Sequence, residues 1–354
     1  MPVKRVQKTP MPERDAVLRS HDFEEVNEGY GIAHAQFEAE RCLRFQDPVC
    51  IAGCPVSVPI PEFIHEIAKG DMQAAAKVLR ASNPLPAVCG RVCPQEVQCE
   101  EQCSIGIRFK PVAIGYLERF VADWEMQQPA TDIEARLDRA EKVAIIGSGP
   151  AGLVCAGELA RLGYPVTIFE ALHAPGGVLR YGIPEFRLPK DVLDWEIDQL
   201  RKLGVEIQCN VIIGKTITMD ELMDEMGFSA VFVGTGAGLP SFMGIPGENL
   251  NGVYSANEFL TRVNLMRAND FPNADTPVMV GKRVAVIGAG NTAMDTVRTA
   301  LRVGAEQGLI VYRRSDQEMT ARVEEHQHAI EEGVEFHWLT NPIEVLGDEE
   351  GWVT

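Results

Sequence analysis

The segment KVAIIGSGPAGLVCAGELARLGYPVTIFE, residues 142–170, consists of an apolar run, a glycine-rich turn, an amphipathic stretch and a second apolar run. Both apolar runs are short and rich in β-branched residues, as in strands, whereas the stretch between them has helical spacing. A strand, a helix and a second strand in this order form a βαβ unit, whose two strands lie parallel in one sheet. The segment therefore predicts an α/β fold.

A second copy of this arrangement starts at Arg283 and reads RVAVIGAGNTAMDTVRTALRVGAEQGLIVYRR. Another strand pattern, AVFVGTGAG, lies between the two copies. Two βαβ units in one chain predict two Rossmann-like units.

The first copy carries G-x-G-x-x-G at Gly147, Gly149 and Gly152, directly after a strand and before a helix, and Glu170 ends the next strand. Glycine permits a tight turn close to a pyrophosphate, the helix N-terminus offers free N–H groups, and the carboxylate accepts from ribose hydroxyls. The strand, turn, helix and acid together indicate a dinucleotide site. A glycine turn that binds no ligand is the alternative.

The second copy has Gly288, Gly290 and the tolerated Ala293, but its second strand ends in Arg313 and Arg314 instead of an acid. Two guanidinium groups there can pair with a 2′-phosphate, which favours NADP(H) over NAD(H), with solvated surface arginines as the alternative. We therefore expect FAD on the first loop, with its flavin near the turn after Pro175, and NADP(H) on the second. The residues expected to bind them are Gly147, Gly149, Pro150, Ala151, Gly152, Glu170, Gly177 and Val178, and then Gly288, Ala289, Gly290, Asn291, Thr292, Arg313 and Arg314.

The chain has nine cysteines, and all except Cys155 and Cys209 lie between residues 42 and 103. No apolar leader or membrane-length apolar run is visible, so we expect a cytoplasmic protein, in which a dense cysteine set holds a metal more often than disulfides. Structural zinc is the alternative, although C-x3-C and C-x5-C differ from its usual C-x2-C spacing. Cys155 and Cys209, expected in a helix and a strand, are predicted to be buried apolar residues.

Net charge excludes two classes of partner. At a formal charge of −18 the chain is repelled by polyanions, so neither nucleic acid nor an anionic membrane is expected as a main partner. Around the cysteines the pattern predicts helices: one from Phe37, one or two over residues 59–83, and one over residues 111–128, followed by a linker at 127–132.

GSGPAG, FEALHAPGGVLRYGIPEFRLPK, VGTGAG, GIPGENLNGVYSANEFL and VIGAGNTAMDTVRTALRVGA together resemble the small, flavin-containing subunit of glutamate synthase. They are also similar to the large subunit of NADH-dependent ferredoxin:NADP oxidoreductase and to the N-terminal half of dihydropyrimidine dehydrogenase. The resemblance covers essentially the whole chain. It implies an all-α domain with two [4Fe–4S] clusters, followed by an FAD domain into which an NADP(H) domain is inserted.

The resemblance also implies ligands for both clusters. The family's first cysteine block reads C-x2-C-x4-C-x3-C, but here Phe45 stands at the second position. One cluster would be bound by Cys42, Cys50 and Cys103, and the other by Cys54, Cys93, Cys99 and Glu118. Cys89 is expected to pack beside the ligands. Phe45 leaves one iron without a thiolate, so we expect a [3Fe–4S] centre, an exogenous ligand or a lost cluster.

The implied function is that of an NADPH-oxidising electron-transfer subunit, in which FAD passes electrons singly to the clusters and then to a partner. The resemblance implies that Arg187 contacts FAD and that Glu324 and Glu325 lie near the nicotinamide, unless they merely begin an exposed helix. The partner would be a glutamate synthase large subunit, or a small flavin/[2Fe–2S] subunit if the chain is of the bifurcating type.

In the resembling proteins the FAD domain resumes after the NADP(H) domain with a glycine/aspartate motif, and no such segment follows here. We therefore expect a fragment or truncated product, in which FAD binding is weak and a non-catalytic binding module is the second alternative. The expected domains are a helical Fe–S domain at 1–130, the first part of an FAD domain at 140–280, and an incomplete NADP(H) domain at 281–354.

Overall fold

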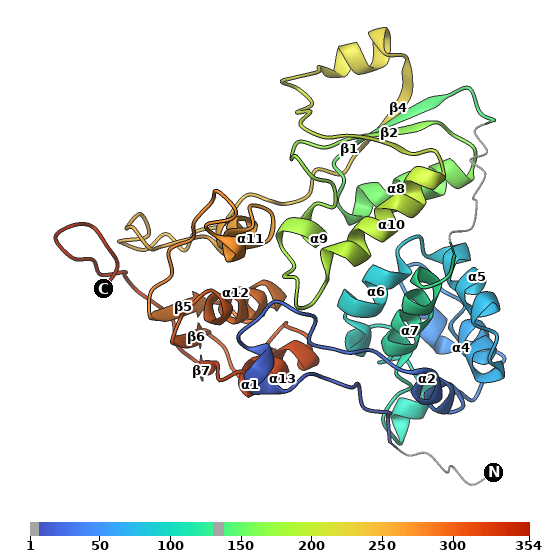
Figure 1. The fold of residues 1–354 in the computed structure, drawn as a ribbon, viewed down its shortest axis with the longest axis horizontal. Coiled ribbons are helices and arrows are strands. Elements are labelled where there is room, and N and C mark those ends of the chain that lie inside the picture. Colours follow the sequence, from blue (N-terminus) through green and yellow to red (C-terminus); the bar gives the residue numbers. More distant parts are fainter. Residues whose placement is uncertain (1–6, 130–137) are drawn as a thin grey trace. The chain divides into compact units, whose positions relative to one another are not determined.

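The computed structural model describes residues 7–129 and 138–354. Their contacts divide into two compact units (Figure 1). Unit 1 comprises residues up to Glu13 together with Val26–Gly176 and Arg187–Thr235, and unit 2 comprises Arg14–Glu25, Gly177–Phe186 and Gly236–Thr354. Unit 1 thus contains both the cysteine-rich helices and the first sheet.

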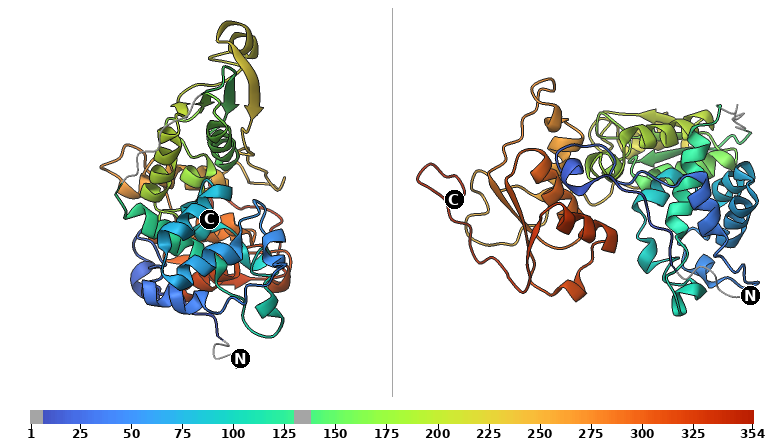
Figure 2. Two further views of the ribbon diagram at one scale, coloured as in Figure 1. Left: turned by 90° about the vertical axis from the view of Figure 1, so that its right-hand side faces the viewer. Right: turned by 60° about the horizontal axis from the view of Figure 1, so that its bottom comes forward.

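The helices of unit 1 before residue 130, blue to teal in Figures 1 and 2, pack around one apolar core. The predicted helix over residues 59–83 is two helices, because Gly70, at φ 87°, ends the first and the Asp71 side chain caps the second by accepting from Ala74 N–H at 2.9 Å. The helix predicted from Phe37 begins earlier, at Ile32. The helices are α2 (Ile32–Ala39), α3 (Val49–Ala52), α4 (Ile60–Lys69), α5 (Met72–Ser82), α6 (Pro86–Val92) and α7 (Ile114–Met126).

The first sheet is parallel and has the order β3-β2-β1-β4. Its strands are β1 (Lys142–Ile146), β2 (Val166–Phe169), β3 (Glu206–Gln208) and β4 (Phe228–Val233). Helices α8 (Pro150–Arg161) and α10 (Lys190–Lys202) lie on one face of it (Figure 1). Cys155 lies in α8 as predicted, but Cys209 follows β3, and both side chains are half-buried, so their assignment to the core was wrong.

A buried ion pair fastens α10 to the cysteine-rich helices within unit 1. Glu196 on α10 accepts from Arg80 Nη1 at 2.6 Å and from Ala87 N–H at 2.7 Å, while the Arg80 guanidinium lies 4.9 Å from the Trp195 ring. Burial raises the pKa of Glu196, and Arg80 and Ala87 oppose that shift. The Glu196 carboxylate is thus paired with both partners, and its contacts connect α10 to the cysteine-rich helices.

The sheet of unit 2 is also parallel, in the order β5-β6-β7. Its strands are β5 (Arg283–Ile287), β6 (Gln307–Val311) and β7 (Glu335–His337), connected by α12 (Asn291–Arg302) and α13 (Val323–Glu331). Unit 2 further contains α1 (Ala16–Arg19), α9 (Val178–Tyr181) and α11 (Ala256–Asn264). The predicted βαβ units are therefore both present. The linker predicted at 127–132 lies partly outside the described residues.

Three arginines and three glutamates form a buried cluster in unit 2, which we call the arginine–glutamate cluster. Glu332 is its centre: it pairs with Arg298 at 2.8 Å, with Arg302 at 2.7 Å and with Arg19 of α1 at 3.2 Å. Helix α1 lies beside α13 as a result (Figure 1). The members are Arg19, Arg298, Arg302, Glu325, Glu331 and Glu332.

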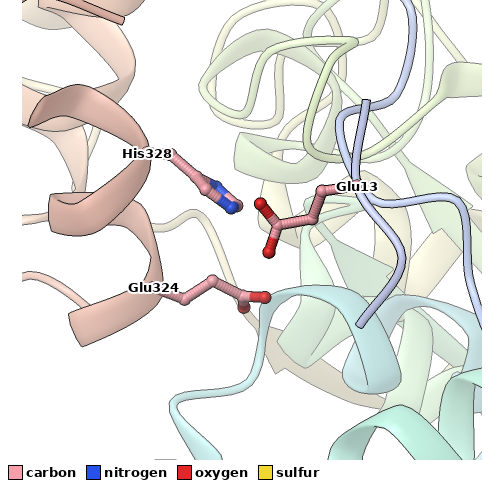
Figure 3. A group of neighbouring side chains, drawn as sticks. All are labelled: Glu13, Glu324 and His328. Carbon is pink, nitrogen blue, oxygen red and sulfur yellow. The ribbon is translucent and has the colours of Figure 1, made fainter. Parts of the chain in front are cut away.

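Glu324 and Glu325 lie in the first turn of α13, as predicted. Glu325 is buried and paired with Arg298, so the expectation of an exposed helix start is wrong for this residue. Glu324 lies one turn before His328, and both project from the same face of α13 (Figure 3).

Within residues 7–129 and 138–354, no helix has the length and apolar composition needed to cross a bilayer.

Candidate functional site

The first glycine loop has the backbone geometry that its sequence predicts. Gly147 has φ 99°, and a Cβ on Gly152 would lie 2.0 Å from the Gly147 carbonyl oxygen, so neither position accepts a side chain. A Cβ on Gly149 would meet no atom within 4 Å, which leaves open space in front of the α8 N-terminus. An anion such as a pyrophosphate fits this arrangement.

Glu170 is buried at the end of β2 and is held beside the loop by three donors. It accepts from Ser148 N–H at 2.9 Å, from Ser148 Oγ–H at 2.5 Å and from Leu172 N–H at 2.8 Å. Ser148 Oγ in turn accepts from Gly176 N–H at 2.9 Å. Ser148 was not predicted as a site residue, although its place inside G-S-G already put it next to the acid. It connects three predicted parts of the site.

The turn after Pro175 needs two glycines, because Gly176 has φ 124° and Gly177 has φ 53°. Val178 begins α9 and is partly exposed, whereas Arg187 is buried. Gly177 and Val178 belong to unit 2 and Arg187 to unit 1. Their contact with FAD remains a prediction.

The second glycine loop is covered by a segment that the sequence did not single out. Ala289 C=O accepts from Thr320 N–H at 3.3 Å and from Ala321 N–H at 3.1 Å, and the Asn291 side chain accepts from Arg322 N–H at 2.9 Å. The Ser315–Glu318 capping box, readable as S-x-x-E, positions the start of this segment. The loop is thus braced on one side and ends in the N-terminus of α12.

Arg313 and Arg314 follow the carboxyl end of β6 and are exposed. Within the described residues neither guanidinium forms an ion pair. Parallel strands of open α/β sheets bind ligands at their carboxyl ends, so both cations lie at the edge where the nucleotide is expected. They are therefore available for a phosphate.

The cysteines form two groups in the sequence, at residues 42–54 and 89–103, and the two groups come together at the loop after α3. A Cβ on Gly53 would lie 2.7 Å from the Gln98 carbonyl oxygen and 2.8 Å from Gln102 Cγ, so the two segments touch. Cys50 and Cys54 lie on either side of Gly53, and Cys99 and Cys103 border Gln98 and Gln102. The fold therefore brings together cysteines from both groups, as the ligand prediction requires.

Cys42, Cys50 and Cys103 are neighbours, which we call the first cysteine set. Burial, and then the neighbouring Cys42 and Cys103, raise the pKa of Cys50 to about 11. Burial and Cys103 likewise raise the pKa of Cys42, and Arg44 opposes that shift. The thiolate forms of these cysteines repel one another, so a cationic iron centre would stabilise all three thiolates together.

Cys54, Cys93, Cys99 and Glu118 form the second cysteine set. Burial raises the pKa of Cys99, and Glu118, Cys54 and Cys93 add to the shift. Burial and Cys93 raise the pKa of Glu118 to about 8, although its carboxylate accepts from Asn83 Nδ2 at 2.8 Å. Cys89 Sγ contacts Asn83 Oδ1 at 3.7 Å, a position beside the set that agrees with its predicted role.

The spacing of the sulfurs can be compared with that expected for a single zinc ion. Four ligands around one zinc ion lie about 3.8 Å apart for bonds of about 2.3 Å. Among the described residues, no three cysteine sulfurs lie within 4.8 Å of one another. The second set, with three thiols and a carboxylate, fits a four-iron cluster, whereas the first set offers three thiols.

The loop before α3 carries Phe45 where the resemblance predicts a fourth thiol for the first set. Phe45 is half exposed, in the loop between Cys42 and α3. Its neighbour Arg44 has φ 53° and contacts the His65 ring. The first set thus has three of the predicted ligands, whereas the second set has four.

Two parallel-sheet units with glycine loops, joined to a helical cysteine domain, define the class of a nucleotide-dependent oxidoreductase with an iron–sulfur domain. Residues 19–130 match the family described as dihydropyrimidine dehydrogenase domain II, 4Fe-4S cluster, and residues 141–354 match the family described as pyridine nucleotide-disulphide oxidoreductase. The chain belongs to the glutamate synthase small-chain-like family of FAD- and NADP-dependent, 4Fe-4S-containing oxidoreductases.

Two relatives and one solved structure are similar to this chain. The glutamate synthase [NADPH] small chain of Escherichia coli (strain K12) is 36% identical over 348 residues, which are 97% of this chain and 73% of that protein. The NADPH-Fe(3+) oxidoreductase subunit beta of Geobacter sulfurreducens is 40% identical over 311 residues, 86% of this chain and 44% of that one. FprA from Mycobacterium tuberculosis (His57Gln mutant) is 22% identical, with a TM-score of 0.50 over 61% of this chain and 62% of that chain, and so supports the fold alone. The first of these relatives is named as a small chain and the second as a subunit beta.

Proposed function

We propose that this chain is the electron-input subunit of an NADPH-oxidising complex of the glutamate synthase type. One observation carries the proposal: two dinucleotide loops with opposite charge at their strand ends share the chain with two cysteine sets. Bound FAD accepts electrons in pairs and releases them singly, which joins a two-electron donor to one-electron clusters. A cytoplasmic location and a glutamate synthase large subunit as partner belong to the same proposal.

The chain's own residues divide the work. Glu170 and the Gly147–Gly152 loop hold the FAD adenosine and pyrophosphate. The Gly288–Gly290 loop holds the pyrophosphate of NADP(H), and Arg313 and Arg314 take its 2′-phosphate. No side chain needs to act as a nucleophile or a base, because the role of these residues is to bind and orient.

The second cysteine set would hold the cluster that accepts electrons from bound FAD. Asn83 donates to Glu118 at 2.8 Å, and the next residue, Pro84, lies 3.3 Å from where a Cβ of Gly157 on α8 would be. The set is therefore connected through one short segment to the helix that begins at the first glycine loop. The first cysteine set, with its half-exposed loop, would then pass electrons to the partner.

The test is anaerobic purification of the full chain, followed by flavin absorbance, iron and sulfide analysis and NADPH-dependent reduction of a dye. Bound flavin and dye reduction support the proposal. A protein that carries neither flavin nor NADPH-dependent activity would instead favour a non-catalytic binding module.

A second candidate function is electron input to a different complex. The 40% identical Geobacter sulfurreducens relative is named as a subunit of an NADPH-Fe(3+) oxidoreductase, and the sequence also resembles the large subunit of the bifurcating ferredoxin:NADP oxidoreductase. Co-purification decides: a large amidotransferase-type subunit supports the glutamate synthase type, and a small flavin/[2Fe–2S] subunit supports the bifurcating type.

The preference for NADPH provides a prediction. Replacing both Arg313 and Arg314 by Gln removes two charge-assisted contacts to the 2′-phosphate, so we expect KM for NADPH to rise roughly 10- to 100-fold while KM for NADH changes little. The measurement is dye reduction with each nucleotide.

The matched control removes two cations from the other end of the sheet, by replacing Lys282 and Arg283 by Gln. Lys282 pairs with Glu306 at 2.9 Å and Arg283 starts β5, so neither lies near the carboxyl ends of the strands. A rise in KM for NADPH in this control equal to that of the test variant would attribute the effect to net charge and contradict the assignment.

A further inference from the structure

Three loops of unit 2 meet at the carboxyl edge of its sheet. They follow β5, β6 and β7, and backbone hydrogen bonds join them: Gly288 N–H to Val311 C=O at 2.9 Å, and Tyr312 N–H to His337 C=O at 3.0 Å. The first loop carries the glycines and the second carries the two arginines. The third, Trp338–Thr340, has no role in the function proposed above.

Leu339 in this third loop is unusual in two independent ways. Its φ is 55°, in the left-handed region that bulky side chains rarely adopt, and its side chain is 76% exposed. Two hydrogen bonds hold the backbone there: Leu339 N–H donates to Arg314 C=O at 3.1 Å, and Thr340 N–H donates to Tyr312 C=O at 3.0 Å. Glycine or asparagine adopts this backbone conformation with less strain than leucine does, so a role for the leucine side chain would account for its presence.

Aromatic rings fix the base of the same loop. Trp338 stacks on Phe336 with ring centroids 5.1 Å apart and meets the Tyr312 ring edge-on at 6.1 Å. His326 contacts the Phe336 ring edge-on at 4.8 Å. These contacts join the β6 and β7 ends, so Leu339 is presented to solvent from a rigid support beside Arg314.

We propose that Leu339 is the apolar wall on which the adenine ring of a 2′-phosphorylated adenosine packs. The inference rests on the proposed function, because Arg313 and Arg314 would bind the 2′-phosphate of the same ligand. An exposed apolar side chain, on a loop whose backbone bonds to that of Arg314, complements an aromatic base joined to a phosphate dianion that the two arginines would bind. A solvent-exposed turn residue with no ligand is the competing explanation.

Two replacements separate these explanations, because each suits the left-handed backbone while removing the apolar wall. Leu339→Gly and Leu339→Asn should fold at least as well as the parent, since their backbones tolerate positive φ. We expect both to bind 2′,5′-ADP about tenfold more weakly, which corresponds to losing part of the burial of a leucine side chain. Leu339→Met keeps an apolar wall and should stay within about twofold of the parent.

The experiment is isothermal titration calorimetry of the full chain with 2′,5′-ADP, and with reduced nicotinamide mononucleotide as a probe that lacks the adenosine half. Weaker 2′,5′-ADP binding by the Gly and Asn variants, with unchanged mononucleotide binding and thermal unfolding, supports the inference. Affinity for 2′,5′-ADP equal to that of the parent in both variants overturns it and leaves the proposed function standing. A parent chain that binds neither 2′,5′-ADP nor NADPH overturns the proposed function and this inference together.

Discussion

Replacing Phe45 by Cys is expected to add roughly one iron per chain and to remove the EPR signal of an oxidised three-iron centre. The first cysteine set contributes three thiols, Cys42, Cys50 and Cys103, and Phe45 lies three residues after Cys42 in the loop before α3. Because Cys₄ ligation is the common arrangement for four-iron clusters, a thiol at this position would supply the missing fourth ligand. The measurements are iron and sulfide quantitation and EPR on anaerobic protein.

The fold should tolerate this replacement. Phe45 is 51% exposed and is no part of the described apolar core of the helices, so its loss leaves little cavity. Leu43→Cys is the matched control, since it introduces a thiol into the same exposed loop two residues away. We expect no gain of iron from Leu43→Cys, nor from Phe45→Ser.

Two ordinary four-iron clusters in the unmodified chain would show that the first set finds a fourth ligand elsewhere and would contradict the prediction. Zinc in place of iron would overturn the electron-transfer proposal as a whole. A gain of iron in Phe45→Cys alone would show that the residue at this position limits the first cluster.

The parts of the fold that the sequence predicts are those in which neighbours in sequence are also neighbours in space. Gly147, Gly149 and Gly152 lie within one turn, and the strand, turn and helix around them are specified by local pattern. The pattern over residues 59–83 predicts one or two helices, and Gly70 in the left-handed region together with the Asp71 cap makes them two, α4 and α5. Helix boundaries depend on such single residues.

Features made by distant residues could not be predicted. Arg19 pairs with Glu332, which lies 313 positions later, and no local sequence pattern around either residue predicts this pairing. The alternative that Glu325 begins an exposed helix is wrong for the same reason, because Arg298 pairs with it in a buried cluster. Its predicted place near the nicotinamide stays a prediction. The left-handed backbone of Leu339 could not be predicted either, because the hydrogen bonds that accompany it go to the carbonyl groups of Tyr312 and Arg314, after β6.

Within the candidate site the same distinction applies. The cysteine sets were divided between two clusters by resemblance, and the fold places Cys103 with Cys42 and Cys99 with Cys54. Their role as ligands is still a proposal. Ser148 could have been predicted from its place inside G-S-G. The segment over Ala289 could not, because its contribution is made by backbone N–H groups, which no residue type reveals.

Replacing Glu332 by Gln should destabilise unit 2 by about 3–5 kcal/mol, because one neutral amide cannot balance Arg19, Arg298 and Arg302 in a buried site. The Phe186 ring lies 4.7 Å from the Arg298 guanidinium and 3.9 Å from the Arg302 guanidinium, so both arginines also make a cation–π contact in the buried cluster. The measurement is urea unfolding of the full chain, followed by hydrogen exchange of α12 and α13. Glu331→Gln is the matched control: Glu331 is one residue away, pairs with Arg19 alone in the described cluster and is partly exposed, so we expect about 1 kcal/mol or less.

The dependence of stability on pH distinguishes a lost charge from altered packing. Burial alone would raise the pKa of Glu332, but hydrogen bonds and charge from Arg298 and Arg302 outweigh it and lower the pKa to about 2. A carboxyl whose pKa is lowered on folding stabilises the protein above its ordinary value near 4.5, and that contribution is lost as pH falls toward 2. The parent should therefore lose about 3 kcal/mol of stability from this group between these pH values, and Glu332→Gln should lose none of it. Parallel pH profiles for parent and variant would mean that Glu332 acts through its shape, and that the three arginines are balanced by the other acids of unit 2.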